Sequence, residues 1–453
     1  MMTGKKVLGM KFKNGLQRFG YTLTHYKLVI FLVWAILLSL VLSVIMWFNS
    51  GHVDEAAQTN RSAATLTTAK SLSNIYSPEQ LLYTDEAGQS SSVLDFRPIN
   101  AKIIQALQTW KTGSISQEKV SAAKLVKIVQ TKNTFVIGFG DGVAGSVVNK
   151  LFGDHFGIPN NAQIYSVQVP KAAQPEVVRF IDDKKKIVYT CQINKADKSL
   201  HKLNVPNDTA AIKIKYGAEH LLVYFIQPIQ LDTYTYLQGV NKIDTYVTAL
   251  FANSKETPRA FHVGDELGYN DGANKQLKVN PSDGTYKFDS YNTNTKLNSF
   301  GARLQSAYSW LKVIRQLPDN LYYFESHDEG KTINFRLYAN GLPIMNDKGY
   351  GSITVQQKAT KHVQLAFSQY ILQVPLPSTD KRVVTLQPTA VILAELKQAG
   401  YSKKAITNLR FCYTWESDKN YTDAVTLRPE WYVELAKDDQ WYAVDELVQQ
   451  GGN

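Results

Sequence analysis

The stretch TFVIGFGDGVAGSVVNKLFG, residues 134–153, joins a run typical of a strand to a run typical of a helix. Its glycines Gly140, Gly142 and Gly145 have the spacing of a dinucleotide-binding turn, in which backbone N–H groups approach a pyrophosphate at a helix N-terminus. Such a site also needs an acidic residue about 20 positions further on. The next strand-like run, residues 162–171, contains no carboxylate. We therefore interpret the stretch as a strand-to-helix turn that uses glycine for its backbone freedom.

An uncharged apolar run, LVIFLVWAILLSLVLSVIMWF at residues 28–48, predicts a transmembrane helix. At about 1.5 Å per residue it would span roughly 30 Å, the thickness of the hydrocarbon core. The preceding residues 1–27 form a basic tail with six Lys or Arg and no acid, whereas Asp54 and Glu55 follow the run. The positive-inside rule then predicts a cytoplasmic N-terminus and an extracellular remainder. A cleaved signal peptide is the alternative, but no small-x-small cleavage site follows the run.

One face of the predicted span carries small side chains. Ala35, Ser39 and Ser43 recur at every fourth position, so a helix places them on one side. Small residues let two helices approach closely inside a membrane. We name Ala35, Ser39 and Ser43 as the candidate transmembrane packing face. The alternative is that alanine and serine are simply common in such spans.

Beyond a polar tether, residues 49–75, strand-like and helix-like runs predict an α+β fold with mainly antiparallel sheets. About four hundred exterior residues favour two or three domains. We expect an N-terminal α+β domain over residues 76–200, a central domain over 201–318 and a C-terminal domain over 319–453. Within the central domain, the Gly-, Asn- and Asp-rich residues 266–294 predict loops and short hairpins.

Charge and cysteine content exclude several classes of protein. Of the formal net charge of +11, six positive charges lie in the tail, where they suit anionic inner-leaflet lipid. The remaining five are too few to indicate nucleic-acid binding, although they are compatible with weak contact with an anionic cell wall. Cys191 and Cys412 are the only cysteines, so a disulfide scaffold is excluded. We expect both to be small buried residues, with a single bridge between them as the alternative.

No catalytic or metal-binding motif stands out. The eight histidines form no H-E-x-x-H or H-x-H pattern, and no C-x-x-C or G-x-S-x-G is present. The densest polar cluster, His327 with Asp328 and Glu329, lies between two strand-like runs and predicts a solvated hairpin turn. We therefore expect no catalytic residue, no cofactor and no metal, and a protein that is not an enzyme. A hydrolase on the outer side is the weakest alternative.

Four runs in the last third of the chain resemble, in this order, the C-terminal part of YycH-type proteins. They are FRLYANGLPIM (335–345), VPLPSTD (374–380), VTLQPTAVILAELKQAG (384–400) and VTLRPEWYVEL (425–435). The length, the single predicted span and the exterior remainder are similar too, so the resemblance covers nearly the whole chain.

The resemblance implies a regulatory accessory protein of the WalK–WalR (YycG–YycF) two-component system of low-GC Gram-positive bacteria. Such a protein associates through transmembrane helices with the sensor histidine kinase and with a YycI-like protein, and modulates the kinase. The resemblance also implies three exterior domains, of which the last two resemble YycI, so that residues 319–453 would be YycI-like. An extracellular module that binds wall polymer or peptide is the alternative function.

Overall fold

The computed structural model describes residues 70–451, apart from 207, 265, 292–296, 316, 377–381, 419–420 and 422, together with six residues between 32 and 39. The chain divides into two compact units, residues 1–61 and residues 62–453. Each unit is described by itself.

In the first unit, the described residues Leu32, Trp34 and 36–39 are helical and have exposed side chains. Ser39 of the candidate packing face is among them, whereas Ala35 and Ser43 lie outside the described residues. No helix within the described residues is long and apolar enough to cross a membrane. Most of the predicted span falls outside the part of the chain that this finding covers, so the span stays a prediction.

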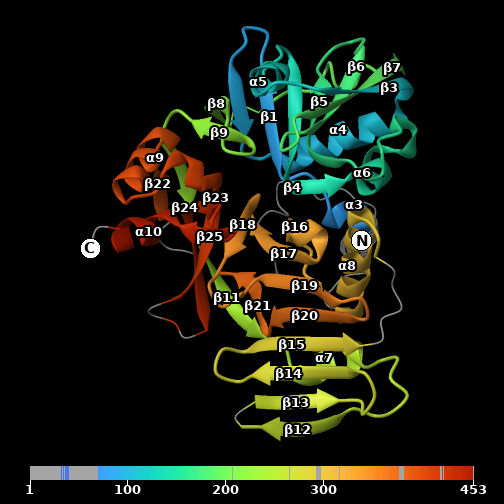
Figure 1. Cartoon of the computed structure of the whole chain (residues 1–453), viewed down its shortest axis with the longest axis vertical. Helices are drawn as coiled ribbons and strands as arrows, with labels where there is room; N and C mark the ends of the chain where they lie inside the picture. Colours follow the sequence, from blue (N-terminus) through green and yellow to red (C-terminus); the bar gives the residue numbers. More distant parts are fainter. Residues whose placement is uncertain are drawn as a thin grey trace, which may run out of the picture. The chain divides into compact units, whose positions relative to one another are not determined.

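The second unit opens with a nine-stranded sheet and the helices that cover it (Figure 1). Its strands are β1 (Gln80–Thr84), β2 (Ser90–Val93), β3 (Lys111–Lys119), β4 (Thr134–Ala144), β5 (Gln163–Pro170), β6 (Val177–Asp182), β7 (Ile187–Lys195), β8 (Thr209–Tyr216) and β9 (Leu221–Phe225). The strand order is β3-β7-β6-β5-β4-β1-β2-β8-β9, and the neighbouring strands pair antiparallel.

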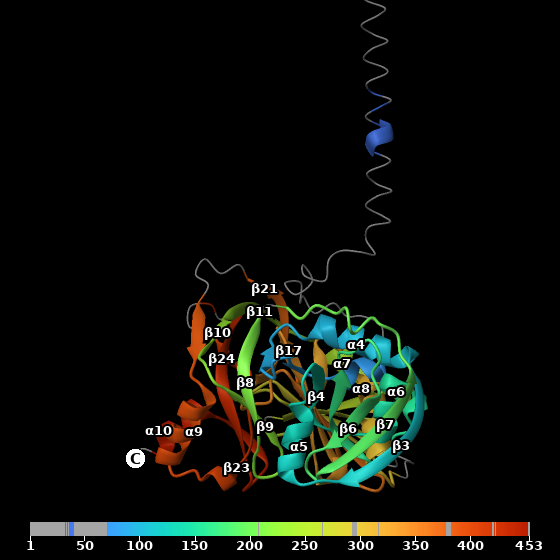
Figure 2. The ribbon, with the colours of Figure 1, turned by 90° about the horizontal axis from the view of Figure 1, so that it is seen from above.

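The helices of this part are α3 (Leu72–Ile75), α4 (Arg97–Thr109), α5 (Ala122–Val129) and α6 (Gly145–Phe152), followed by the short turn η1 (Asp154–Phe156). Successive side chains of β4 point to opposite faces of the sheet, and apolar side chains on both faces explain why helices cover both of them. Phe135 and Ile137 pack in one hydrophobic cluster with α4 and α6, whereas Val136 packs in another with α5. Accordingly, α5 lies on the opposite side of these strands from α4 and α6 (Figure 2).

A second, fourteen-stranded sheet follows. Its strands are β11 (Tyr234–Val240), β12 (Arg259–Val263), β13 (Glu266–Asn270), β14 (Lys275–Asn280), β15 (Thr285–Tyr291), β16 (Leu321–His327), β17 (Thr332–Ala339), β18 (Leu342–Met345), β19 (Ser352–Ala359), β20 (His362–Ser368), β21 (Tyr370–Pro375), β23 (Ile406–Ser417), β24 (Ala424–Leu435) and β25 (Gln440–Ala443). Among the described strands, β18 and β23 form the one parallel pair. The predicted α+β class with mainly antiparallel sheets is therefore confirmed.

The remaining elements are the two-stranded sheet of β10 (Ile229–Asp232) and β22 (Val383–Leu386), the helices α7 (Ile243–Leu250), α8 (Phe300–Ile314), α9 (Thr389–Gln398) and α10 (Val444–Gly451), and the turns η2 (Asp328–Gly330) and η3 (Lys403–Ala405). Helix α8 begins at a serine cap, because the Ser299 side chain accepts a hydrogen bond from the Ala302 N–H.

Two parts of the chain differ from what the sequence predicted, one in its regularity and one in its sheet partner. The Gly- and Asn-rich residues 266–294 contain β13, β14 and β15, which continue into β20. Cross-strand pairs such as Leu277 with Phe288 fill one face of these hairpins. Strands β8 and β9 extend the first sheet past residue 200, because β8 pairs with β2. The domain boundary expected at residue 200 therefore does not coincide with an edge of this sheet, and the domain boundaries stay predictions.

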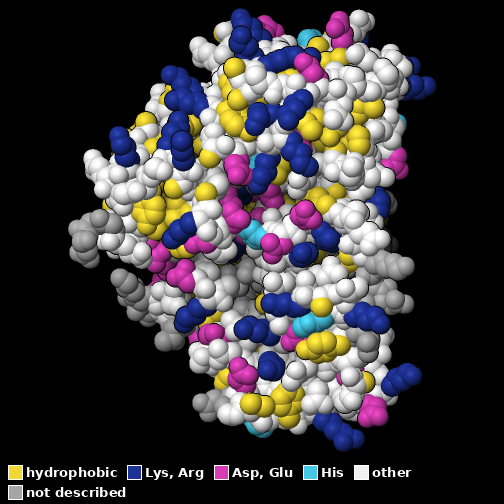
Figure 3. Space-filling model, in the orientation of Figure 1, with side chains coloured by type: hydrophobic (Ala, Val, Ile, Leu, Met, Phe, Trp, Pro, Cys, Tyr) yellow, Lys and Arg dark blue, Asp and Glu magenta, His cyan; other side chains and the backbone are white. Residues whose placement is uncertain are grey.

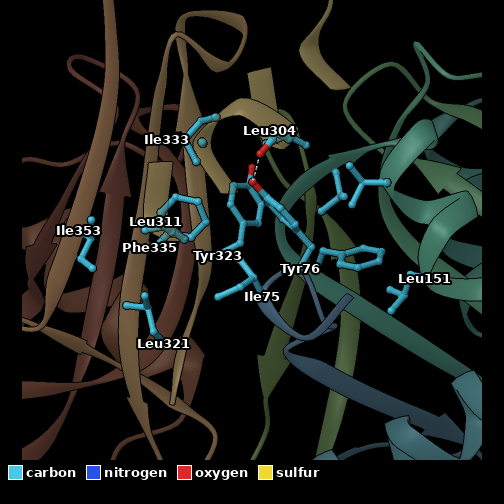
Figure 4. Packing of buried hydrophobic residues seen from close by; sticks show 14 of the residues in the cluster. Ile75, Tyr76, Leu151, Leu304, Leu311, Leu321, Tyr323, Ile333, Phe335 and Ile353 are labelled. Atoms are coloured by element: carbon cyan, nitrogen blue, oxygen red, sulfur yellow. Dashed lines mark hydrogen bonds between the residues drawn. The ribbon is translucent and has the colours of Figure 1, made fainter. Parts of the chain in front are cut away.

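A continuous hydrophobic core joins the two sheets (Figure 4). Tyr76, at the end of α3, is fully buried and lies with its ring centroid 5.1 Å from that of Tyr323 on β16. The Tyr76 hydroxyl donates a 2.7 Å hydrogen bond to the Leu304 carbonyl of α8. Phe335 on β17 and Leu151 on α6 belong to the same cluster. The first helix of the unit is thereby fixed to elements that lie far away in sequence.

Lys70, the first residue described in the second unit, is also held by the second sheet. Its ammonium donates to the carbonyls of Asp319 and, at 2.7 Å, of Leu321. It lies 3.6 Å from the centre of the Tyr322 ring. The Lys70 carbonyl accepts a 2.7 Å hydrogen bond from the Tyr308 hydroxyl of α8. Burial, with the nearby charge of Arg97, lowers the pKa of Lys70 to about 7.

Candidate functional site

A polar cleft of about 760 Å³ lies where the two sheets meet. Its lining comes from β4, β5 and the turns after β6 and β8 of the first sheet, and from β16, β23 and β24 of the second. Nine carboxylates line it, against four lysines and arginines. Acidic, basic and histidine side chains gather in the hollow at the centre of the face seen in Figure 3.

The glycine-rich stretch of β4 forms one wall of the cleft. Gly138 pairs with Ser166 and Val143 with Ile164. Residues 139–142 therefore bulge out of the β4–β5 ladder, opposite a single residue of β5. We call residues 139–142 the junction segment, because their polar groups face the second sheet.

The junction segment is held by three residues of the second sheet. Arg410 on β23 donates from Nη2 to the Gly140 carbonyl at 2.7 Å, and the Tyr323 hydroxyl donates to the Gly142 carbonyl at 3.1 Å. The Asp141 carboxylate accepts from the Ser326 N–H at 2.8 Å, from the Ser326 hydroxyl at 3.0 Å and from the Tyr323 hydroxyl at 3.2 Å. The segment that resembles a nucleotide-binding turn thus binds another part of its own chain.

These positions require glycine because a side chain would collide with neighbouring atoms, and not because the backbone adopts a conformation that only glycine favours. None of Gly140, Gly142 and Gly145 has a positive φ. A Cβ would lie 2.6 Å from a Glu79 carboxylate oxygen at position 140, 2.8 Å from the Tyr165 ring at 142 and 2.1 Å from the Pro159 carbonyl oxygen at 145. The structural interpretation of the glycines fits this geometry, but the reason given for it, backbone freedom, was wrong.

A buried ion pair crosses the junction beside these glycines. Arg410 Nη1 lies 3.3 Å from Glu79 Oε2, and the Glu79 side chain is only 8% exposed. Burial raises the pKa of Glu79 to about 7, even though the Arg410 charge opposes the shift. The buried Tyr338 hydroxyl forms a hydrogen bond with the same carboxylate, which also opposes the rise in the pKa of Glu79. The guanidinium also lies 4.9 Å from the centre of the Trp441 ring.

A second charged group surrounds Glu325 on β16. Its carboxylate accepts hydrogen bonds from Asn334 at 2.9 Å and from the Trp441 indole at 2.7 Å, and lies 3.4 Å from His327 Nε2. The bond to Glu325 raises the pKa of His327 to about 9. Burial, together with the charges of Glu325 and Asp141, raises the pKa of Glu434 on β24 to about 7.

The predicted solvated turn at residues 327–329 requires a correction. The turn η2 is present, and the Glu329 side chain is 89% exposed. His327, however, is only 20% exposed, because it turns toward Glu325 in the cleft. The ion pair with a buried carboxylate offsets the loss of hydration at this histidine.

Further groups lie at the rim of the cleft or away from it. His220 Nδ1 lies 3.0 Å from the Asp183 carboxylate, which also accepts from the Leu221 N–H at 2.9 Å. Among the described residues, no group of three or more His, Cys, Asp or Glu is arranged to hold a metal ion. Cys191 and Cys412 are buried and unpaired, which confirms their expected role as small buried residues.

Sequence reasoning missed the charged residues of the cleft, because they come from five separate strands or loops. Glu79, Asp141, Glu325, Arg410 and Glu434 have no fixed spacing. The available signal was a single charge inside an otherwise apolar strand, as in LYYFES, NLRFCY and WYVEL. A buried charge in a strand requires a partner, although the strand alone does not identify it.

Comparison with known proteins places the chain in a family. The family model for the YycH protein N-terminal domain matches residues 24–205, and that for the YycH protein C-terminal domain matches residues 219–452. The chain belongs to the YycH family. This confirms the resemblance inferred from the four runs of the last third. The YycH family is associated with regulation of a kinase of the WalK (YycG) type.

The fold is similar to the crystal structure of YycH from Bacillus subtilis, with a TM-score of 0.67 and 16% sequence identity. That comparison covers 83% of this chain and 98% of the Bacillus chain, and it shows a shared fold. An uncharacterized protein from Eubacterium rectale has a TM-score of 0.28 and 10% identity, over 49% of this chain and 86% of its own. Comparison with curated proteins gives no match.

Proposed function

We propose that this YycH-family protein is a membrane-anchored extracellular regulator. It modulates a sensor histidine kinase of the WalK (YycG) type by associating in the membrane with that kinase and with a YycI-like partner. The observation that carries the proposal is the match of the two YycH family models to residues 24–205 and 219–452. The uncharged run at residues 28–48, with a basic flank before it and acids after it, supports the anchor and its orientation.

The contacts of the cleft support a regulatory role without turnover. Across the junction, Arg410 and Tyr323 of the second sheet donate hydrogen bonds to the junction segment, and the Asp141 carboxylate of that segment accepts one from Tyr323. Such contacts stabilise one arrangement of the two sheets. For recognition inside the membrane, close helix packing is the available driving force, because lipid tails are as apolar as leucine. We therefore assign the contact with the kinase to the face of Ala35, Ser39 and Ser43.

Crosslinking in membranes tests this assignment with the full-length protein. Ala35→Ile combined with Ser39→Ile should reduce the yield of crosslinks to the kinase about fivefold, which corresponds to about 1 kcal/mol, without preventing insertion. Leu37→Ile combined with Val41→Ile is the matched control, because it changes the span away from this face. The control should leave the yield unchanged.

Two results would contradict the proposal. An unchanged crosslinking yield in the Ala35 and Ser39 variant would assign recognition to the extracellular part. Orientation is tested separately, with a reporter that is active on only one side of the membrane and is fused after Asn453. Activity of this reporter in the cytoplasm would overturn the orientation and, with it, the extracellular function.

A further inference from the structure

We propose that the outer face of the second sheet binds an acidic polysaccharide. The strands concerned are β14, β15, β20, β19 and β17, and we call their outward-pointing side chains the polar face. The proposal goes beyond the regulatory role and does not rest on the contact with the kinase. Three observations carry it: two opposed lysines without a carboxylate partner, an exposed tyrosine ring held in place, and a long row of polar side chains.

Buried and accessible side chains alternate along these strands. Phe288, Leu365 and Val355 point inward and belong to the same hydrophobic core as Leu250 of α7 and Leu311 of α8. Their neighbours in sequence point to the opposite face, which is mostly polar. Charged side chains on this face are visible below the cleft in Figure 3. An antiparallel sheet commonly has one solvated face, so polarity alone does not indicate a ligand.

The first observation is a pair of like charges. Lys278 on β14 lies directly opposite Lys287 on β15 in the register of the two strands. Like charges in this position destabilise a sheet. Among the described residues, neither lysine forms an ion pair with a carboxylate. An acidic group of a ligand, bound between the two ammonium groups, would offset their repulsion.

The second observation is an exposed aromatic ring in a fixed orientation. Tyr291, at the end of β15, is 44% exposed. Its ring is stacked on that of His362, with the centroids 4.3 Å apart and an angle of 25° between the planes. His362 Nε2 lies 2.7 Å from an Asp289 carboxylate oxygen, which also accepts from the Gln364 amide at 3.0 Å. The tyrosine therefore presents a flat apolar surface on which the C–H groups of a sugar ring can pack.

The third observation is a row of side chains that crosses five strands. The register places them in the order Lys278, Lys287, Ala366, Thr354 and Asn334. At the usual spacing of strands this row is about 19 Å long. The adjacent row adds the amides of Gln276, Gln364 and Gln356. An amide both donates and accepts hydrogen bonds, as the hydroxyl and acylamino groups of sugars require.

Together these features favour one class of ligand. Sugar rings match the tyrosine, their hydroxyl and acylamino groups match the amides, and acidic substituents match the two lysines. The length of the row favours several sugar units over a single one. Two lysines are too few for a nucleic acid, whose binding depends on contacts with many phosphates.

Isothermal titration calorimetry on the full-length protein in detergent tests the proposal. The probes are a hyaluronan octasaccharide, which carries both carboxylates and acetamido groups, and chitohexaose, which carries acetamido groups without charge. We expect the octasaccharide to bind with a Kd below about 1 mM and at least about fivefold more tightly than chitohexaose. Equal affinities would remove the role of the lysines and overturn the acidic class. Absence of binding by the octasaccharide would overturn the whole proposal.

Two matched pairs of variants locate the site. Tyr291→Ala removes the ring and should weaken binding of the octasaccharide about fivefold, whereas Tyr291→Phe keeps the ring and should not weaken it. Lys287→Gln should also weaken binding about fivefold. Lys213→Gln removes the same charge from an exposed position of β8 in the first sheet and should leave the affinity unchanged.

Two patterns among these variants would contradict the proposal. Binding that neither Tyr291→Ala nor Lys287→Gln weakens would lie elsewhere, as on the basic N-terminal tail. Weakening by Lys287→Gln without any effect of Tyr291→Ala would indicate attraction between charges and no site for sugar rings. Either pattern would overturn the assignment of a polysaccharide to the polar face.

Discussion

At the scale of single residues, the junction depends on glycines that leave room for other atoms. A Cβ at position 145 would lie 2.1 Å from the Pro159 carbonyl oxygen, a backbone atom that cannot rotate away. We expect Gly145→Ala to lower the free energy of unfolding by about 3 kcal/mol, measured by urea unfolding of the full-length protein. Gly157→Ala is the control, since Gly157 has a positive φ but no atom near its absent Cβ. It should cost only about 1 kcal/mol, and equal losses would argue against the steric explanation.

At the scale of elements, one buried guanidinium joins β4 and β23. Arg410→Met leaves the buried Glu79 carboxyl without its ion-pair partner. We expect this variant to lower the free energy of unfolding by about 3 kcal/mol at pH 8 and by about 1 kcal/mol at pH 5. Urea unfolding at the two pH values measures the difference.

The pH dependence follows from the raised pKa of Glu79. Between the ordinary glutamate pKa of 4.5 and the folded pKa of Glu79, about 7, the folded protein holds a proton that the unfolded chain releases. This carboxyl therefore makes the free energy of unfolding fall as pH rises through that window. Without Arg410 its folded pKa rises further, so the loss is greater at pH 8. Adding Glu79→Gln to Arg410→Met should flatten the dependence, and a loss equal at both pH values would indicate that Arg410 acts through packing alone.

At the scale of residues 62–453, the hydrophobic core runs through both sheets. Phe152 on α6 and Leu365 on β20 belong to the same cluster of buried residues. We expect one cooperative thermal transition for this unit, and Phe152→Ala and Leu365→Ala should each destabilise it by about 3 kcal/mol. Calorimetry of the full-length protein measures this. Two transitions, each shifted by only one of the variants, would show that the sheets unfold independently.

Local patterns in the sequence were sufficient for most individual elements. The apolar period of α4 and the alternation of buried and less buried residues along β20 depend only on neighbouring residues, so both elements could be predicted. The local patterns could not predict which strands pair with each other. Strand β8 pairs with β2, which lies far earlier in the chain, and no local signal distinguishes it from a strand of the next domain.

The site was harder to predict than the fold, since its charges meet only after folding. Arg410 is the clearest case, because its partners Glu79 and Gly140 lie in the first sheet, several hundred residues earlier. The glycine spacing did identify an unusual segment. Its meaning depends on whether the space above each glycine is filled by a ligand or by another side chain, and composition does not contain that information.

The attachment of Lys70 bears on how tension would travel through the molecule. The Lys70 ammonium donates hydrogen bonds to the carbonyls of Asp319 and Leu321, at the start of β16. A force applied at Lys70 would therefore act on the second sheet through these hydrogen bonds as well as along the backbone toward β1. The same strand carries Glu325 and His327 at its far end, so β16 connects the attachment of Lys70 to the wall of the cleft.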